Sequence, residues 1–210
     1  MKLTKEKLIE KLIKDDYLKT PAIIDAFNKI NRMDFVPENL KEVAYADQAL
    51  PIGEGQTISQ PLTVAFMLEL LQPKKGDKIL DVGSGSGWQA ALLSEIVGEE
   101  GKIITIERIN ELKVMAESNI EKYKFLTRGI AKVILGDGGG GHKEEAPYDK
   151  IIAAASAEDE IPYAWKEQLK IGGKIVAPLG QSIVVIEKIG QSEFSEKSFF
   201  GFTFVPLLVG

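Results

Sequence analysis

Acidic side chains and glycines that follow apolar segments are the residues of this chain whose types and spacing could carry chemistry. Residues 79–87 read ILDVGSGSG, in which an apolar run contains Asp81 and passes into Gly83, Gly85 and Gly87. Glycine lets a backbone approach a ligand closely, and open α/β sheets bind ligands at the carboxyl ends of their strands. The pattern therefore predicts a ligand-binding loop after residue 82.

The spacing of these glycines argues against a dinucleotide. A dinucleotide fingerprint has the form G-x-G-x-x-G, and counting from Gly83 and Gly85 its third glycine falls on Trp88. An indole at that position crowds the helix N-terminus where a pyrophosphate would bind, whereas S-adenosylmethionine brings only a small carboxylate and a sulfonium. S-adenosylmethionine is therefore the cofactor we expect.

Two further acidic residues stand at the ends of later apolar runs. Glu107 closes the run 102–107, where a carboxylate can accept hydrogen bonds from both hydroxyls of a ribose. Asp137 follows the run 131–135 in the segment LGDGGGG, where it could accept from an adenine amino group. Alone, Glu107 would be interpreted as a solvated charge and Asp137 as a turn aspartate. Together with Asp81, they indicate an S-adenosylmethionine-dependent methyltransferase.

A parallel sheet is needed to bring these residues together, and the chain from Lys78 onward alternates strands and helices as such a sheet requires. Helices are expected near 89–97 and 111–124. The last two strands should pair as an antiparallel hairpin. We therefore predict an α/β, Rossmann-like methyltransferase fold: N-terminal helices and a seven-stranded, mostly parallel sheet with an antiparallel edge strand. The expected strands are 78–82, 102–107, 131–135, 149–154, 174–178, 182–188 and 198–205.

The segment before the sheet is expected to be helical. Thr20 followed by Pro21 predicts an N-cap and the first position of a helix. Residues 50–61 carry glycines, prolines and hydroxyls without a clear period, so we expect a loop there and then a helix through Leu71. One domain is expected over residues 1–210, made of a helical region (1–47), a cofactor-binding core (48–190) and a C-terminal edge strand (191–210).

Composition excludes several kinds of site and partner. The chain has 210 residues with no Cys and one His, which rules out thiolate zinc sites, multi-histidine metal centres and Cys/His nucleophile pairs, so no metal is expected. Its net charge of −5 and the lack of a long apolar run disfavour nucleic-acid and membrane partners. The charged N-terminus does not read as a signal peptide, so a cytoplasmic protein is expected, and a monomer.

Several segments outside the glycine loop form a recognisable set. They are FVP (35–37), AYAD (44–47), LPIGEGQTISQP (50–61), GSGSGWQAALLSEIVG (83–98), IERINEL (106–112), APYDKII (146–152), EQLKIGGKIVAPLG (167–180) and FVPL (204–207). In these segments the chain resembles the protein-L-isoaspartate (D-aspartate) O-methyltransferase family, from about residue 32 to 207. The glycine loop is common to most methyltransferases, whereas GQTISQP and FVPL are specific to this family.

The resemblance implies a reaction and a set of site residues. A methyl group passes from S-adenosylmethionine to the α-carboxyl of an L-isoaspartyl residue in a damaged protein, so isoaspartyl peptides and proteins are the implied substrates. Acceptance of D-aspartyl residues stays open. Ser59 of the T-I-S motif is the implied catalytic residue. The expected cofactor-binding residues are Thr57, Ile58, Asp81, Gly83, Ser84, Gly85, Gly87, Glu107, Arg108, Asp137 and Gly138.

The role of Ser59 and the identity of the methyl acceptor each have alternatives. Ser59 could instead only cap the helix that begins near Pro61. A methyltransferase with another small-molecule or protein acceptor is the main alternative, and a noncatalytic S-adenosylmethionine-binding module is a further one. A nucleic-acid amino-group methyltransferase is disfavoured because residues 153–162 read AAASAEDEIP, without the Pro-Pro-aromatic motif of such enzymes.

Two segments depart from the family pattern. Gly138–Gly141 is a run of four glycines where the family carries bulkier residues, and we expect a mobile loop there. Ser156–Glu160 reads SAEDE, longer and more acidic than the link expected before Ile161. Both departures are expected to affect substrate contacts more than cofactor binding.

Overall fold

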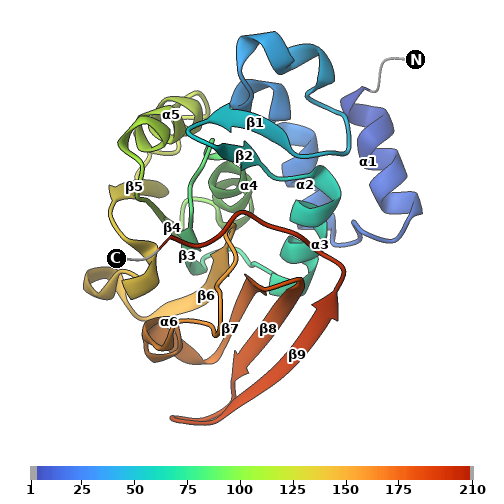
Figure 1. The fold of residues 1–210 in the computed structure, drawn as a ribbon. Helices are drawn as coiled ribbons and strands as arrows, with labels where there is room; N and C mark the ends of the chain where they lie inside the picture. Colours follow the sequence, from blue (N-terminus) through green and yellow to red (C-terminus); the bar gives the residue numbers. More distant parts are fainter. Residues whose placement is uncertain (1–3, 209–210) are drawn as a thin grey trace.

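A seven-stranded sheet forms the centre of the structure, a computed structural model that describes residues 4–208 (Figure 1). The strands lie in the order β5-β4-β3-β6-β7-β8-β9, and β1 and β2 form a separate two-stranded sheet. The strands are β1 (Leu50–Gly53), β2 (Gln56–Ile58), β3 (Lys78–Val82), β4 (Lys102–Glu107), β5 (Ala131–Leu135), β6 (Tyr148–Ala153), β7 (Leu169–Leu179), β8 (Ser182–Lys188) and β9 (Phe194–Phe200). The α-helices are α1 (Lys5–Lys14), α2 (Pro21–Lys29), α3 (Pro61–Leu71), α4 (Trp88–Val97), α5 (Asn110–Glu121) and α6 (Tyr163–Gln168), and the 3₁₀-helices are η1 (Arg32–Phe35), η2 (Glu38–Val43), η3 (Gly138–Gly140) and η4 (Lys143–Glu145).

The direction of the strands places a ligand site at the middle of the sheet. Strands β5, β4, β3, β6 and β7 run parallel, whereas β8 pairs antiparallel with β7 and β9 antiparallel with β8. The chain order reverses between β3 and β6, and such a switch point is where open α/β sheets bind ligands. The predicted fold class, with its antiparallel edge, is confirmed.

Alternating side chains divide each central strand between two cores. Ile79 and Ile103 belong to the core that includes α3, α4 and α5, whereas Leu80 and Ile104 belong to the core that includes α6. Since side chains alternate along a strand, Asp81 lies on the same face as Ile79 and points toward α4. The polar residues near the ends of β3 and β4 therefore lie under the helices that follow the glycine loop.

The N-terminal region is helical, as predicted, over its described residues. Thr20 precedes Pro21 at the start of α2 as expected, but its hydroxyl does not cap the helix. Instead the Thr20 hydroxyl donates to Glu69 Oε2 of α3 at 2.7 Å, and its backbone N–H donates to Glu69 Oε1 at 2.7 Å. The start of α2 is thus joined to α3 by tertiary contacts.

The segment 50–61 was expected to be a loop, and the structure corrects this. Leu50–Gly53 and Gln56–Ile58 pair as an antiparallel hairpin, with Leu50 opposite Ile58. Glu54 and Gly55 have φ of 52° and 68°, the positive values that two-residue hairpin turns require at their central positions. The prediction failed because such a short strand pair leaves no periodic pattern.

The last strand was expected over 198–205, and this boundary is wrong. β9 covers Phe194–Phe200, and at Gly201 the chain turns with φ of 109°. Residues 201–208, here named the C-terminal strap, then cross the carboxyl ends of the central strands, as the dark red chain in Figure 1 shows. Ser156 holds the strap, because its N–H donates to Val205 O at 2.8 Å and its carbonyl accepts from Leu207 N–H at 2.7 Å.

Candidate active site

The glycine loop between β3 and α4 adopts backbone conformations that suit glycine. Gly83, Gly85 and Gly87 have φ of 87°, 51° and 87°. A Cβ on Gly87 would also come within 3.1 Å of Ala116 and 3.0 Å of Ile120 on α5. Substitution there would be strained both by the backbone conformation and by the close packing of the loop against α5.

Asp81 lies behind this loop and does not line the cleft, and its contact with a cofactor stays a prediction. Its side chain is fully buried and accepts from Gln89 Nε2 at 2.7 Å and from Thr105 Oγ1 at 2.8 Å. Thr105 also shares a 2.6 Å hydrogen bond with the Ser84 hydroxyl. Burial raises the pKa of the Asp81 carboxyl to about 6, against the lowering effect of these hydrogen bonds, and the charge of Glu107 raises it further. The network joins β3, β4, α4 and the glycine loop.

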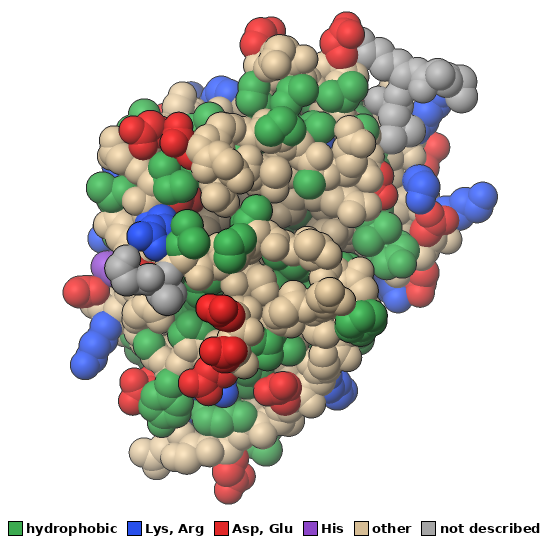
Figure 2. All heavy atoms as spheres, viewed as in Figure 1, with side chains coloured by type: hydrophobic (Ala, Val, Ile, Leu, Met, Phe, Trp, Pro, Cys, Tyr) green, Lys and Arg blue, Asp and Glu red, His purple; other side chains and the backbone are tan. Residues whose placement is uncertain are grey.

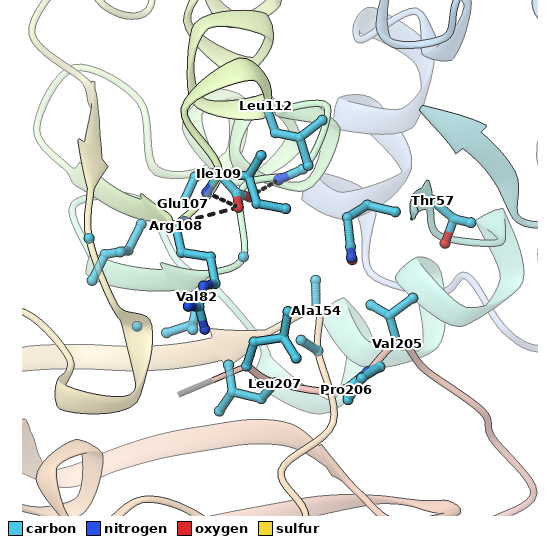
Figure 3. A pocket seen from close by; sticks show the side chains of 18 residues that line it. Thr57, Val82, Glu107, Arg108, Ile109, Leu112, Ala154, Val205, Pro206 and Leu207 are labelled. Atoms are coloured by element: carbon cyan, nitrogen blue, oxygen red, sulfur yellow. Dashed lines mark hydrogen bonds between the residues drawn. The ribbon is translucent and has the colours of Figure 1, made fainter. Parts of the chain in front are cut away.

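Glu107 at the end of β4 is held by three backbone N–H groups. Its Oε2 accepts from Gly85 N–H at 2.9 Å, and its Oε1 accepts from Arg108 and Ile109 N–H at 2.9 and 3.1 Å (Figure 3). The residue is only 6% exposed and lines the cleft described next. A carboxylate has about four acceptor sites, so this one is held in a fixed position and keeps acceptor capacity for a ligand.

A cleft of about 610 Å³, including the part open to solvent, lies at the carboxyl ends of β3, β4 and β6. We name it the main cleft. In Figure 3 Glu107 and Leu112 lie on one side, the strap residues Val205–Leu207 on the other, and Thr57 closes one end. Of the predicted cofactor-binding residues, it is lined by Thr57, Gly83, Gly85, Glu107, Arg108 and Gly138.

The glycine run after β5, where we expect a mobile loop, accepts two side-chain hydrogen bonds from α6. Trp165 Nε1 donates to Gly138 O at 2.8 Å, and Gln168 Nε2 donates to Gly140 O at 2.8 Å. A Cβ on Gly138 would lie 2.4 Å from Val82 Cγ1, so glycine is required for close packing. Both donors belong to α6, a helix that the sequence pattern did not predict, and the mobility of the run stays a prediction.

Asp137 occupies the rim of the main cleft without lining it. Its side chain is exposed, and Oδ1 accepts from Gly139 N–H at 2.8 Å. Its neighbours Gly136 and Gly138 do line the cleft. The structure thus places this carboxylate beside the cleft, as the N-cap of η3.

Two further hollows adjoin the main cleft, and Thr57 and Ala154 line all three. The first, of about 720 Å³ with its open part, is here named the hydroxyl hollow and is lined by Ala49, Thr57, Ser59, Gln60, Thr63, Ala154, Thr203, Phe204 and Val205. The second, of about 320 Å³ and named the inner recess, includes Ile58, Ser59, Ser84, Gly83, Gly85 and Trp88. Ser59 therefore lies between the glycine loop and the hydroxyl hollow.

Ser59 does not cap the following helix, so that alternative is wrong. The N-cap position of α3 is Gln60, and no side chain at that position makes a capping hydrogen bond. The carboxylate of Asp47 accepts from Leu62 N–H at 2.9 Å instead. Among the residues that the structure describes, the Ser59 hydroxyl makes no hydrogen bond and is available to a ligand.

Sequence reasoning missed Arg32, a buried residue beside this site. Its guanidinium is 1% exposed and donates from Nη1 to Ala44 O and from Nη2 to Gln48 O and Ser59 O. The only signal in the sequence is a charged residue just before the FVP segment, which would also fit a solvated surface position. The contact with Ser59 depends on tertiary structure and has no local pattern.

The acidic link 156–160 lies at the outer rim of the site. Ser156 and Ala157 make isolated bridges to Pro206 and Leu179, so the link begins under the C-terminal strap. Glu158, Asp159 and Glu160 are exposed, and Figure 2 shows acidic side chains gathered on this face of the molecule. These three side chains therefore project into solvent, and none of them lines the main cleft.

Known proteins share both this sequence pattern and this fold. A profile of the family described as protein-L-isoaspartate (D-aspartate) O-methyltransferase matches residues 3–210. The chain belongs to this family. The protein-L-isoaspartate O-methyltransferase of Methanopyrus kandleri is 44% identical over 208 residues, 97% of this chain and 91% of that protein. The protein of the same name from Methanothrix thermoacetophila is 44% identical over 209 residues, 98% of this chain and 95% of that protein.

A solved structure supports the fold independently of close sequence similarity. A Plasmodium falciparum protein described as a protein-L-isoaspartate O-methyltransferase, crystallised with S-adenosyl-L-homocysteine, superposes with a TM-score of 0.88 at 24% identity and covers 98% of this chain and 99% of that chain. The predictions of the family, the fold class, a methyltransferase and S-adenosylmethionine as its cofactor are confirmed.

Proposed function

We propose that this protein-L-isoaspartate O-methyltransferase family member methylates the α-carboxylate of L-isoaspartyl residues in damaged proteins, with Ser59 orienting that carboxylate. The observation that carries the proposal is the position of Ser59. It lines both the hydroxyl hollow and the inner recess, and the recess also contains Gly83 and Gly85 of the glycine loop. An acceptor in the hollow and a cofactor on the loop would therefore meet at Ser59.

The main cleft fits S-adenosylmethionine. The positive φ angles of Gly83 and Gly85 bring the backbone to the edge of the cleft without side chains, and the fixed carboxylate of Glu107 can accept from ribose hydroxyls. Apolar side chains such as Leu112 and Val82 line the remaining walls. When bound, S-adenosylmethionine supplies a methyl group on a positively charged sulfur, which a carboxylate oxygen displaces to give a methyl ester and S-adenosylhomocysteine.

The hydroxyl hollow suits an anionic acceptor. None of its lining residues is charged, and four of them, Thr57, Ser59, Thr63 and Thr203, carry hydroxyls. Within the part of the chain that the structure describes, none of these four hydroxyls makes a hydrogen bond. Hydroxyl groups can donate to a carboxylate and hold it without neutralising its charge.

No general base is needed in such a site. The α-carboxyl of an isoaspartyl residue titrates at roughly 3.3 to 3.7, so at neutral pH it is already an anionic nucleophile. The residues of the hollow need only exclude water and align one carboxylate oxygen, and orientation of this kind supplies about 7 to 11 kcal/mol. The uncharged lining of the hydroxyl hollow is consistent with a site that orients the carboxylate and supplies no base.

Release of methanol from the product tests the proposal. The protein is incubated with methyl-labelled S-adenosylmethionine and a peptide that contains one isoaspartyl residue, and volatile label is measured after mild base treatment, which cleaves carboxyl methyl esters. The matched control is the same peptide with a normal aspartyl residue. Base-labile label on the isoaspartyl peptide alone is expected. No label on it, or equal label on both peptides, would exclude the proposed acceptor.

Other expectations stay predictions. Among residues 4–208, no helix has both the length and the apolar character that crossing a bilayer demands. A cytoplasmic location, a monomeric state and the absence of a nucleic-acid partner are what we propose from the composition, and size-exclusion chromatography with light scattering would test the monomer.

A further inference from the structure

We propose that Arg32 is a positioning residue for the methyl transfer, because it connects the backbone of Ser59 to the first turn of α4. This inference rests on the proposed function and deepens it. Arg32 lies in η1, outside the hydroxyl hollow, the inner recess and the main cleft. Its effect on an acceptor would therefore act through Ser59.

The guanidinium donates hydrogen bonds to three backbone carbonyls. Nη2 donates to Gln48 O at 3.1 Å and to Ser59 O at 3.0 Å, and Nη1 donates to Ala44 O. These carbonyls precede and follow the β1-β2 hairpin. The planar fork of an arginine can reach all three at once, which the single ammonium of a lysine cannot do with the same geometry.

The same guanidinium lies over the ring of Trp88. The Arg32 Cζ atom is 5.1 Å from the centre of the indole ring, within the range of a cation–π contact. Trp88 is the first residue of α4, directly after Gly87, and it lines the inner recess together with Ser59. Phe27 packs against this indole edge-on at 5.6 Å between ring centres. One side chain thus contacts both the acceptor-side loop and the cofactor-side helix.

Arg32 has no carboxylate partner within 4.0 Å among the described residues, although it is almost fully buried. Burial lowers the pKa of its guanidinium to about 10, against the raising effect of the more distant Asp47 and Tyr45. Burying a charge with only neutral partners is unfavourable for stability. An apolar residue would avoid the cost of burying a charge but would leave the Ala44, Gln48 and Ser59 carbonyls without this donor, so these three contacts are the feature that distinguishes Arg32 from a packing residue.

The Ser59 side chain depends on this arrangement. Since its hydroxyl makes no hydrogen bond among the described residues, the backbone of Ser59 determines the region that the hydroxyl can occupy. That backbone is held on one side by Arg32, through Ser59 O, and on the other by Asp47, through Leu62 N–H. Loss of the Arg32 contact should therefore displace the hydroxyl relative to the glycine loop while the Glu107 hydrogen bonds remain.

The test compares Arg32→Met, which keeps an unbranched apolar stem but removes the guanidinium, and Arg32→Lys with two controls. Leu12→Ala creates a cavity in the same N-terminal layer without contact to the site, and it controls for lost stability. Arg128→Met removes another arginine that stacks on an aromatic ring, Phe125, away from the cleft. The kcat and KM for an isoaspartyl peptide and the Kd for S-adenosylmethionine are measured well below the Tm of every variant.

A specific split of the kinetic constants is expected. Arg32→Met should lower kcat by about 10- to 100-fold, as a displacement of about 1 Å does in other enzymes, with the cofactor Kd changed less than about threefold. Arg32→Lys should recover part of kcat, and both controls should keep kcat within about twofold. The inference is overturned if Arg32→Met and Leu12→Ala have the same kcat, or if Arg32→Met weakens cofactor binding as much as it lowers kcat. If Arg32→Met does not fold, wild-type kcat in Arg32→Lys overturns it.

A measurement without substrate separates this inference from the proposed function. Amide hydrogen exchange over residues 56–62 should be at least about tenfold faster in Arg32→Lys than in Arg128→Met, because one backbone anchor of that segment is weakened. Equal exchange would overturn the positioning role even if the wild-type protein methylates isoaspartyl peptides. A wild-type protein that does not methylate them contradicts the proposed function, and faster exchange in that case still supports the structural link.

Discussion

The carboxylate of Asp47 accepts a hydrogen bond from the backbone N–H of Leu62 at 2.9 Å, and it thereby satisfies the start of α3 from outside the helix. Ser59, which precedes this helix, is left with an unengaged hydroxyl on the edge of the hydroxyl hollow. Asp47 therefore stabilises the start of α3, and the Ser59 hydroxyl remains available to a ligand.

Substitution of these two residues should separate stability from catalysis. Asp47→Ala should lower the free energy of unfolding by about 0.5 to 2 kcal/mol, the usual loss for a helix cap. Ser59→Ala should change it by less than about 0.5 kcal/mol and lower kcat for an isoaspartyl peptide by about 10- to 100-fold, because the carboxylate loses its orienting donor. Urea unfolding and steady-state kinetics measure the two effects, and Ser59→Thr should give an intermediate rate. Wild-type kcat/KM in a folded Ser59→Ala protein would contradict the role of Ser59.

Substitution of Glu107 should weaken cofactor binding. In Glu107→Gln an amide NH₂ replaces one carboxylate oxygen and faces either backbone N–H groups or ribose hydroxyls, so an acceptor is lost. The loss of about 1 to 3 kcal/mol should raise the Kd for S-adenosylmethionine by about 5- to 150-fold in isothermal titration calorimetry. Glu111→Gln, on the exposed side of the first turn of α5, is the control and should bind normally. An unchanged Kd in Glu107→Gln would refute the ribose contact.

The stability of the protein should depend on pH through Asp81. The ordinary pKa of this carboxyl is 3.8, and burial raises it to about 6 in the folded protein. Between these values the folded state binds a proton that the unfolded state does not, so stability falls as pH rises from about 4 to about 6. Relative to Asp81→Asn, which stays neutral, wild-type protein should gain roughly 2 kcal/mol as pH falls from about 7 to about 4. Chemical unfolding of both proteins across this range measures the difference, and a difference independent of pH would show that Asp81 keeps an ordinary pKa.

Two glycines of the same run should respond differently to an added methyl group. A Cβ on Gly138 would lie 2.4 Å from Val82 Cγ1, whereas a Cβ on Gly140 meets nothing within 4 Å. Gly138→Ala should therefore lower the free energy of unfolding by about 1 to 3 kcal/mol and weaken cofactor binding, because Gly138 and Val82 both line the main cleft. Gly140→Ala should leave both properties close to wild type. Similar Tm values for the two variants would contradict the packing of this loop against β3.

The features that could be predicted from sequence are those set by local pattern. Apolar runs ending in Asp81 and Glu107 identify strands and their carboxyl ends, and the spacing of Gly83, Gly85 and Gly87 identifies the loop between a strand and a helix. Because parallel strands end at the same edge of a sheet, these local patterns were sufficient to predict that Gly83, Gly85 and Glu107 meet at one cleft. The predicted strand 198–205 is wrong because local pattern was also its only basis. The apolar pattern continues past Gly201, although the chain leaves the sheet there.

The tertiary structure decided how each of these side chains is used. Asp81 and Glu107 lie in the last two residues of their strands, yet one is buried behind the loop and the other lines the cleft, because their positions depend on how α4 and α5 pack over the sheet. The cap of α3 by Asp47 and the link from Arg32 to Ser59 join residues 15 and 27 positions apart, and no periodicity relates such residues. Hydrophobic period and glycine spacing therefore determine the elements and the edge at which a ligand binds, whereas the partner of each polar side chain depends on contacts that exist only once those elements have packed.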